Sequence, residues 1–271
     1  MTNPNQAFAR DGAAARQYAA CVVPYLLGPW IPDLISWADL QKGDRVLDLA
    51  CGTGAVTRAA AAMLGSSGRV TGLDISSEML DVAKQTLFTI VPAIQWQLGD
   101  AGSMPFVDAT FDVVLCQQGL QFFTDRRLAV AEIRRVLAPR GRFVSAVWSR
   151  IENNPYYWAV AAAADRHLGE EAGRQFRSSF ALGEPSEFRS ALNHSVFKSV
   201  EIRTVAKRLK LPPLPELIPQ HFAGTLLANL FASTAGPSRA ALITDVVRRL
   251  RINEPENATV LPFEVHLALA Q

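Results

Sequence analysis

The sequence predicts a single α/β domain built on a parallel β-sheet, and three observations support this prediction. Its 271 residues, 49% hydrophobic and 19% charged, suffice for one large core. Apolar runs alternate with helical stretches from residue 45 to residue 148, a pattern typical of right-handed βαβ units. The first apolar run ends at Cys51-Gly52-Thr53-Gly54, where the backbone must turn sharply before an alanine-rich helix.

The first half of the chain divides into an N-terminal helical part, 1–40, and a core, 41–149. In the N-terminal part we expect one helix at 13–23, ended by Pro24, and a short second helix at 31–37. The core predicts strands at 45–50, 69–74, 94–98, 111–116 and 142–148. Its helices are expected at 55–64, after Ser76 or Ser77, and at 125–137, where Pro139-Arg140-Gly141 forms a turn.

The pattern changes after residue 150. We expect helices at 155–168, 185–192, 216–232 and 237–251, and strands at 200–210 and 259–269, the latter within a final segment 258–270. The segments 150–183 and 212–255 are interpreted as helical insertions that return the chain to the sheet. Because ligands of parallel sheets bind beyond the carboxyl ends of the strands, these insertions are expected to cover the active site.

Composition argues against several classes of protein. A net charge of +2 gives no strong case for binding nucleic acid or a membrane surface. No charge-free apolar stretch of about 18 residues predicts a membrane span, and the first residues lack the pattern of a signal peptide, so a cytoplasmic location is expected. Metal binding is not expected, because ligand spacing is missing among Cys21, Cys51, Cys116, His167, His194, His221 and His266.

Acidic side chains lie at or near the ends of three predicted strands: Asp48, Asp74 and Asp100. Since these ends meet at one edge of the sheet, we expect the three carboxylates to line one crevice. Asp74 is suited to accept the hydroxyls of a ribose, and Asp100 the exocyclic amine of adenine, with the Ala101 N–H near a ring nitrogen. The pattern therefore predicts an adenosine pocket.

The glycine turn is incomplete as a dinucleotide site. Gly52-Thr53-Gly54 is followed by Ala55-Val56-Thr57, so the third glycine of G-x-G-x-x-G is missing. The negative charge of Asp48 disfavours phosphate and favours a cationic ligand such as a sulfonium. A nucleotide-dependent oxidoreductase and a non-catalytic cofactor-binding protein remain as alternatives, and the covering insertions argue against the second.

Five segments in order, 46–57, 73–76, 99–101, 111–115 and 135–142, resemble the motifs of class I S-adenosylmethionine-dependent methyltransferases. The resemblance covers about 45–148 and is closest to the branch of the ubiquinone and menaquinone C-methyltransferases. It implies a Rossmann-like, seven-stranded sheet with helices on both faces and an antiparallel last strand. It also implies S-adenosylmethionine as cofactor and S-adenosylhomocysteine as product. Arg140 stands where the family often has glycine.

The cofactor-binding residues are predicted from the strand ends and from this resemblance. Gly52 and Gly54 are implied to contact the methionine end, Ile75 and Met79 are expected to sandwich the adenine, and the segment after 116 is implied to lie beside the methionine and the substrate. The predicted set is Tyr18, Asp48, Ala50, Cys51, Gly52, Thr53, Gly54, Asp74, Ile75, Met79, Gly99, Asp100, Ala101, Gln117, Gln118, Gly119 and Phe122.

The predicted function is methyl transfer to a small, partly apolar acceptor at carbon, oxygen or nitrogen. Catalysis is expected to depend mainly on alignment of the nucleophile, the methyl carbon and the sulfur. A base assists if the acceptor is a hydroxyl or an activated carbon, and the candidates are His167, His221 and Tyr156. For both histidines a surface position is the favoured alternative, and for Tyr156 packing explains the residue equally well. The acceptor and the oligomeric state, with a dimer as one option, stay open.

Overall fold

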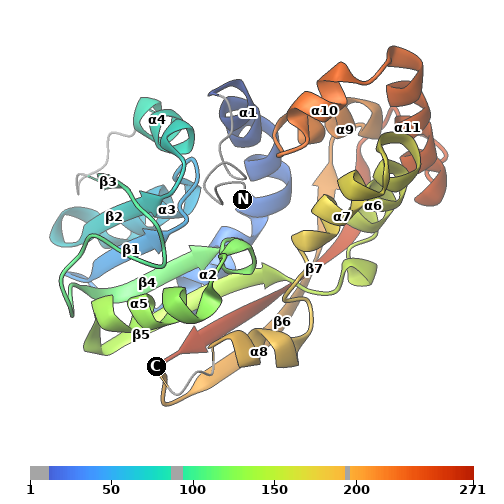
Figure 1. Ribbon diagram of the computed structural model, residues 1–271. Helices are drawn as coiled ribbons and strands as arrows, with labels where there is room; N and C mark the ends of the chain where they lie inside the picture. The colour runs from blue at the N-terminus through green and yellow to red at the C-terminus, as the bar shows by residue number, and fades with distance from the viewer. Residues whose placement is uncertain (1–11, 87–93, 193–195) are drawn as a thin grey trace.

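The computed structural model describes residues 12–86, 94–192 and 196–271 (Figure 1). Its seven-stranded sheet has the order β3-β2-β1-β4-β5-β7-β6. The strands are β1 (Arg45–Leu49), β2 (Arg69–Asp74), β3 (Ile94–Leu98), β4 (Phe111–Gln117), β5 (Leu137–Trp148), β6 (Val200–Leu211) and β7 (Thr259–Ala270). Neighbours among the first five are parallel, whereas β7 is antiparallel to both β5 and β6. The predicted fold class and the antiparallel last strand are confirmed.

Helices cover both faces of this sheet (Figure 1). Helices α2 (Ile31–Ala38) and α3 (Ala55–Leu64) pack with Val46 of β1 on one face. Helix α5 (Arg126–Val136) shares a hydrophobic cluster with Leu47 and Leu49 on the opposite face, where α8 (Pro185–Leu192) also packs. Successive β1 residues therefore meet helices on alternate sides, which explains the continuous apolar run in the sequence. Helix α4 (Ser77–Gln85), capped by the Ser76 hydroxyl, follows β2.

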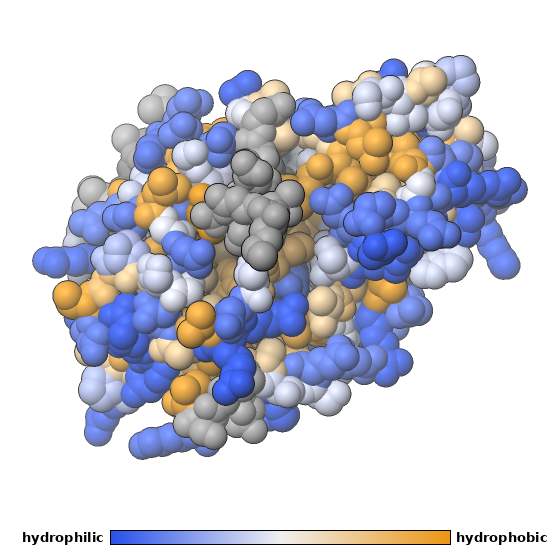
Figure 2. Space-filling view, in the orientation of Figure 1, coloured by the Kyte–Doolittle hydropathy of each residue, from blue (hydrophilic) through white to orange (hydrophobic). Residues whose placement is uncertain are grey.

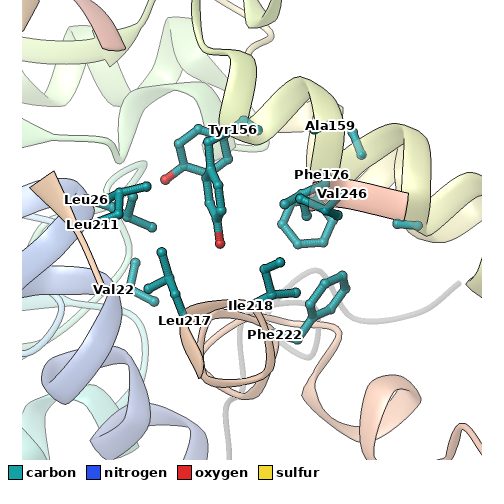
Figure 3. Close-up of a cluster of buried hydrophobic side chains, with 14 of the residues drawn as sticks. Val22, Leu26, Tyr156, Ala159, Phe176, Leu211, Leu217, Ile218, Phe222 and Val246 are labelled. Carbon is teal, nitrogen blue, oxygen red and sulfur yellow. The ribbon is translucent and has the colours of Figure 1, made fainter. Parts of the chain in front are cut away.

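The segments interpreted as insertions form a helical cover, named here by its elements α6 (Pro155–Leu168), α7 (Glu170–Ser178), α9 (Leu214–Ala223), α10 (Ala228–Ser233) and α11 (Gly236–Arg249). Figure 1 shows them grouped at one end of the sheet. In Figure 3, Tyr156 and Phe176 of the cover face Ile218 and Phe222 of α9 and Val22 from the N-terminal part. Because one hydrophobic cluster joins these segments, burial of apolar surface holds the cover on the domain.

The N-terminal part corrects one expectation. Helix α1 (Gly12–Gln17) continues without a break into a π-helix, η2 (Tyr18–Leu27), so the prediction that Pro24 ends the helix is wrong. At its end the Gly28 N–H bonds to the Val23 carbonyl, five residues back. This wider spacing accommodates a residue that cannot donate. A short 3₁₀ turn, η3 (Gly28–Trp30), then leads into α2.

Two further predictions differ from the structure. Pro139-Arg140-Gly141 lies inside β5. Phe111 of β4 pairs with Leu137 of β5, and the next pair is Val113 with Arg142, so β5 has more residues between these two pairs than β4 has. The extra residues bulge out of the ladder, so the expected turn is a strand irregularity. The helix expected at 216–232 is divided, because Gly224 ends α9 with bonds from its N–H to the carbonyls of Gln220 and His221.

One described stretch, Gly12–Ala38, is long and apolar enough to cross a membrane, with a mean hydropathy of 1.3 over the scored window. A third of that window is buried inside the molecule. Trp30, Leu34 and Leu26 within it are fully buried in the core. A core helix passes the same test of length and composition, so this finding is weak evidence for a membrane span.

Candidate active site

The glycine turn after β1 has the backbone that the sequence suggested. Ala50, Gly52 and Gly54 have positive φ values of 56°, 55° and 80°. A Cβ on Gly54 would lie 2.3 Å from the ring of Trp96, so this position has room only for glycine. Ala50 is a non-glycine residue in the left-handed region, which costs about 1–2 kcal/mol. Such local strain is typical of functional sites.

Asp74 at the end of β2 fixes this turn. Its carboxylate accepts the Gly52 N–H at 2.7 Å and the Ser76 N–H at 2.9 Å, and the residue is 8% exposed. The side chain also lines the main cavity. A buried carboxylate held by backbone donors is well placed to accept the hydroxyls of a ribose.

The main cavity, of about 550 Å³, lies beyond the carboxyl ends of the strands. Its cofactor end contains Gly52, Asp74, Met79 and Asp100, and its cover end contains aromatic and apolar side chains together with one histidine. The cover-end residues are Trp148, Tyr157, Phe176, His221 and Leu227. Among the described residues that line the cavity, no Lys or Arg is present, and the charged residues are Asp74, Asp100 and Asp125. The cavity therefore favours a cationic ligand over an anionic one.

Most of the predicted cofactor-binding residues meet in this cavity. Those that line it are Tyr18, Ala50, Gly52, Asp74, Ile75, Met79, Gly99, Asp100, Ala101, Gln117, Gln118, Gly119 and Phe122. Asp48, Cys51 and Thr53 line a small adjoining cavity of about 30 Å³, which shares Tyr18, Leu27, Ala50 and Gln117 with the main cavity. Gly54 lines neither cavity and packs against Trp96.

Asp48 departs from the expectation that three carboxylates line one crevice. It is two residues after Val46, so its side chain lies on the same face of β1, toward α3. There the Thr57 hydroxyl donates to it at 2.5 Å, and the residue is 1% exposed. Burial raises the pKa of Asp48 to about 7. Only Asp74 and Asp100 line the main cavity.

The turn after β4 holds two glutamine amides side by side. The Gln118 Oε1 accepts the Trp148 N–H at 3.2 Å and the Gln121 Nε2 at 2.8 Å. Gln118 has a positive φ of 55°, a second strained residue at the cavity. Within the described part of the chain, the buried Gln118 Nε2 and Gln121 Oε1 atoms have no hydrogen-bond partner. Both residues line the cavity.

Of the candidate catalytic residues, only His221 lines the cavity. It is 3% exposed, so the favoured surface position is wrong. Together with Leu217, Ile218 and Phe222 it lies on the buried face of α9. Its Nδ1 lies 3.0 Å from the hydroxyl of Tyr156, which is fully buried.

The contact with Tyr156 bears on which ring nitrogen of His221 carries the proton. Burial raises the pKa of Tyr156 well above its ordinary value, so its hydroxyl keeps its proton. Of the two possible directions, donation from the Tyr156 hydroxyl to Nδ1 gives the buried phenol proton an acceptor. With the Tyr156 hydroxyl as donor, a neutral His221 would carry its proton on Nε2 and would donate a hydrogen bond from there.

His167 lies elsewhere in the cover, 3.4 Å from Asp245 across α6 and α11, and outside the cavity lining. His266 of β7 contacts the Thr204 hydroxyl at 2.9 Å and the Gly183 carbonyl at 3.0 Å, which confirms its predicted structural role. His194 lies outside the described residues. In the part of the chain that the structure describes, no group of three or more His, Cys, Asp and Glu side chains is arranged to hold a metal ion.

Some cavity residues were not predicted. Phe176 on α7 and Leu227 before α10 carry no motif, and their only signal is that they are apolar residues within the insertions. Trp148 lines the cavity as the last residue of β5. The predicted strand at 142–148 already ended at this residue.

The strand order, the antiparallel β7 and the glycine turn together define a class I methyltransferase fold. Residues 47–145 match the family model described as "Methyltransferase domain".

The chain is also similar to curated quinone methyltransferases. It is 43% identical over 117 residues to the 2-phytyl-1,4-beta-naphthoquinone methyltransferase of Arabidopsis thaliana, which covers 42% of this chain and 45% of that protein. It is 37% identical over 153 residues to a ubiquinone/menaquinone biosynthesis C-methyltransferase of Paraburkholderia xenovorans, which covers 53% of this chain and 62% of that one. The matches thus span about half the length of these relatives.

Solved structures show the same fold. The phosphoethanolamine N-methyltransferase 2 of Haemonchus contortus in complex with S-adenosyl-L-methionine gives a TM-score of 0.63 at 17% identity, over 100% of this chain and 60% of that one. The YcgJ protein of Bacillus subtilis gives a TM-score of 0.57 at 18% identity, over 90% of this chain and 97% of that one. At these identities the likeness shows the fold alone.

Proposed function

We propose that the protein transfers a methyl group from S-adenosylmethionine to a small aromatic acceptor. The observation that carries this proposal is the division of one cavity into two chemically different ends. Asp74, Asp100 and the glycine turn lie at one end, and the aromatic cover lies at the other. The family match at 47–145 covers the cofactor end, while most of the cover end comes from segments outside it.

The residues at the cofactor end fit S-adenosylmethionine. Asp74 is suited to the ribose hydroxyls, Asp100 and the Ala101 N–H to the adenine edge, and Met79 to the adenine face. Gly52 allows close approach of the methionine end, because it has no side chain at a positive φ of 55°. The carboxylates and the lack of Lys and Arg in the described lining suit a sulfonium cation.

When bound, S-adenosylmethionine would supply a methyl group on a positively charged sulfur, which would keep the electron pair of the broken sulfur–carbon bond while the acceptor gave up one proton to solvent. The residues of the chain mainly position the acceptor and exclude water from the site. The cover holds the acceptor in line with the methyl group, and Tyr157 and Phe176 exclude water from the reacting atoms.

The acceptor is proposed to be aromatic and without a negative charge. Trp148, Tyr157 and Phe176 offer ring faces and edges, whereas a carboxylate or phosphate would find no Lys or Arg in the described lining. The two curated relatives act, by their names, on naphthoquinone, ubiquinone and menaquinone compounds, which supports reduced quinones as the first acceptors to test. His221, oriented by Tyr156, is proposed to donate a hydrogen bond to an oxygen of this acceptor.

A cytoplasmic location and the use of a small molecule rather than nucleic acid are part of the same proposal. The three buried free cysteines support a reducing compartment. A cavity lined by carboxylates and lacking Lys and Arg among its described residues does not favour a polyanion.

The experiment is transfer of a labelled methyl group to 1,4-dihydroxynaphthalene under reducing conditions. We expect labelled organic product with the wild-type chain and none with Asp74→Ala. Binding of S-adenosylhomocysteine without transfer to any of a panel of phenols, hydroquinones and aromatic amines would favour the alternative of a non-catalytic cofactor-binding protein.

A further inference from the structure

The glutamine amides after β4 form a polar feature that methyl transfer itself does not explain. Gln121 is 4% exposed, and its Oε1 has no partner among the described residues. The Gln118 Nε2 is likewise buried and unpaired in the described structure. A buried polar atom without a partner costs about 1–3 kcal/mol, so two adjoining ones at a cavity call for an explanation.

The orientation of both amides follows from their neighbours. Gln118 Oε1 accepts from two donors, the Trp148 N–H at 3.2 Å and the Gln121 Nε2 at 2.8 Å. A flipped Gln118 amide would bring its NH₂ group against two donors, which excludes that assignment. A flipped Gln121 amide would place its oxygen against the Gln118 oxygen. The unpaired atoms are therefore a donor of Gln118 and an acceptor of Gln121, on two residues that line the cavity.

The sheet order places this pair on the acceptor side of the cavity. The carboxylates suited to adenosine lie at the ends of β2 and β3, on one side of β1 and β4. The hydrogen bond to Trp148 draws the Gln118 side chain toward β5, on the other side. Trp148 is itself in contact with Tyr157 of the cover, with ring centroids 5.0 Å apart.

We propose that Gln118 and Gln121 form an acceptor subsite that recognises a neutral hydroxyl group. The Gln118 Nε2 donates to the hydroxyl oxygen, and the Gln121 Oε1 accepts the hydroxyl proton. A hydroxyl is both donor and acceptor, so it satisfies both unpaired atoms at once. This inference rests on the proposed function and narrows its acceptors to aromatic molecules that carry a free hydroxyl at or beside the methylated atom.

The subsite also gives selectivity after the reaction. If the recognised hydroxyl is the group that becomes methylated, the product loses the proton that Gln121 accepts. The Gln121 Oε1 then faces an ether, and the product is bound more weakly than the acceptor.

The test compares two probes on the full chain loaded with S-adenosylhomocysteine: 2-naphthol and 2-methoxynaphthalene, which share a ring system but differ in the hydroxyl proton. Calorimetry should show tighter binding of 2-naphthol to the wild-type chain, by about tenfold or more. The variant Gln118→Glu keeps the shape and the oxygen that accepts from Trp148 and Gln121, but loses the donor. The variant Gln121→Met keeps the length and loses the acceptor. Gln121→Met should reduce the preference to about twofold or less, because it loses the acceptor of the hydroxyl proton. Gln118→Glu should instead weaken the binding of both probes, because both carry the oxygen to which Gln118 Nε2 donates.

A matched control is Gln95→Leu, which removes an exposed amide on β3 outside the cavity. This control should keep the wild-type preference for 2-naphthol. Equal affinity of the wild-type chain for both probes, an unchanged preference in Gln121→Met, or unchanged affinity for both probes in Gln118→Glu would overturn the subsite. S-adenosylhomocysteine is titrated into every variant first. Failure of the wild-type chain to bind it would refute the proposed function instead, so the two failures are distinguishable.

Discussion

Replacement of Asp74 by alanine is the sharpest perturbation of the cofactor end. Asp74 accepts backbone N–H groups from Gly52 at 2.7 Å and Ser76 at 2.9 Å and lines the cavity where a ribose would lie. A hydrogen bond to a charged acceptor contributes about 1.5–3 kcal/mol. Loss of two ribose hydroxyl bonds therefore weakens binding by about 3–6 kcal/mol, or roughly a hundredfold to ten-thousandfold in Kd.

The same substitution also loosens the glycine turn. The two backbone N–H groups lose their acceptor, and each orphaned buried donor costs about 1–3 kcal/mol of unfolding free energy. Asp74→Asn keeps one oxygen acceptor and the side-chain shape, so it should fall between the wild-type chain and Asp74→Ala in both stability and affinity.

The assay is calorimetric titration with S-adenosylhomocysteine at a temperature where circular dichroism shows every variant folded. Asp112→Ala is the matched control, because Asp112 also accepts a backbone N–H, from Arg45 at 2.9 Å, and lies outside the cavity lining. A Kd for folded Asp74→Ala within about threefold of the wild-type value would refute the ribose assignment, since a single lost bond already exceeds that ratio.

Three further outcomes follow from the structure. Asp112→Ala removes the part-exposed ion pair with Arg45 and the acceptor for the Arg45 N–H, so thermal unfolding should show that the free energy of unfolding falls by about 1 kcal/mol. Binding of S-adenosylhomocysteine should not change, and a lowered affinity would contradict the position of Asp112 at the far end of β4. The pKa of Asp48 is raised from 3.8 to about 7, so the folded state holds one more proton than the unfolded state between those values. Stability should therefore fall as pH rises from about 4 to about 7, by up to about 1.4 kcal/mol per pH unit, and urea unfolding of Asp48→Asn should lack this slope; an unchanged slope would show that another group titrates. Gly54→Ala should destabilise the protein by more than Gly65→Ala, although both glycines have a positive φ. A Cβ at position 54 would lie 2.3 Å from Trp96, whereas a Cβ at position 65 would meet no atom within 4 Å. Equal losses of stability in thermal melts would mean that Trp96 moves aside freely.

The parts of the fold with strong local signals were predictable from the sequence. Strand 69–74 and the helices at 55–64, 155–168 and 185–192 have the observed bounds, because glycine or proline marks the start of each apolar pattern, at Gly68, Gly54, Pro155 and Pro185. Pro24 was misread, since a π-helix tolerates a residue without an N–H where an α-helix does not. The bulge at 139–141 depends on the register between β4 and β5, which no local pattern specifies.

The candidate site was predictable at the cofactor end and only in part at the cover. Asp74, Asp100 and Gly52 lie at strand ends, whose meeting point follows from the parallel sheet alone. Asp48 lines the small adjoining cavity rather than the main one, because strand alternation turns its side chain toward α3. The contact between Tyr156 and His221 joins residues 65 positions apart through the packing of α6 on α9, which the sequence does not encode locally.

The most direct test of the central claim is a parallel calorimetric titration of the full chain with S-adenosylmethionine, S-adenosylhomocysteine and NAD. The cavity chemistry predicts binding of the first two with Kd values in the micromolar range and no binding of NAD, since the glycine turn lacks the third glycine of a pyrophosphate site and the described cavity lining lacks Lys and Arg. Binding of NAD without binding of either sulfur compound would contradict the methyltransferase assignment and favour an oxidoreductase.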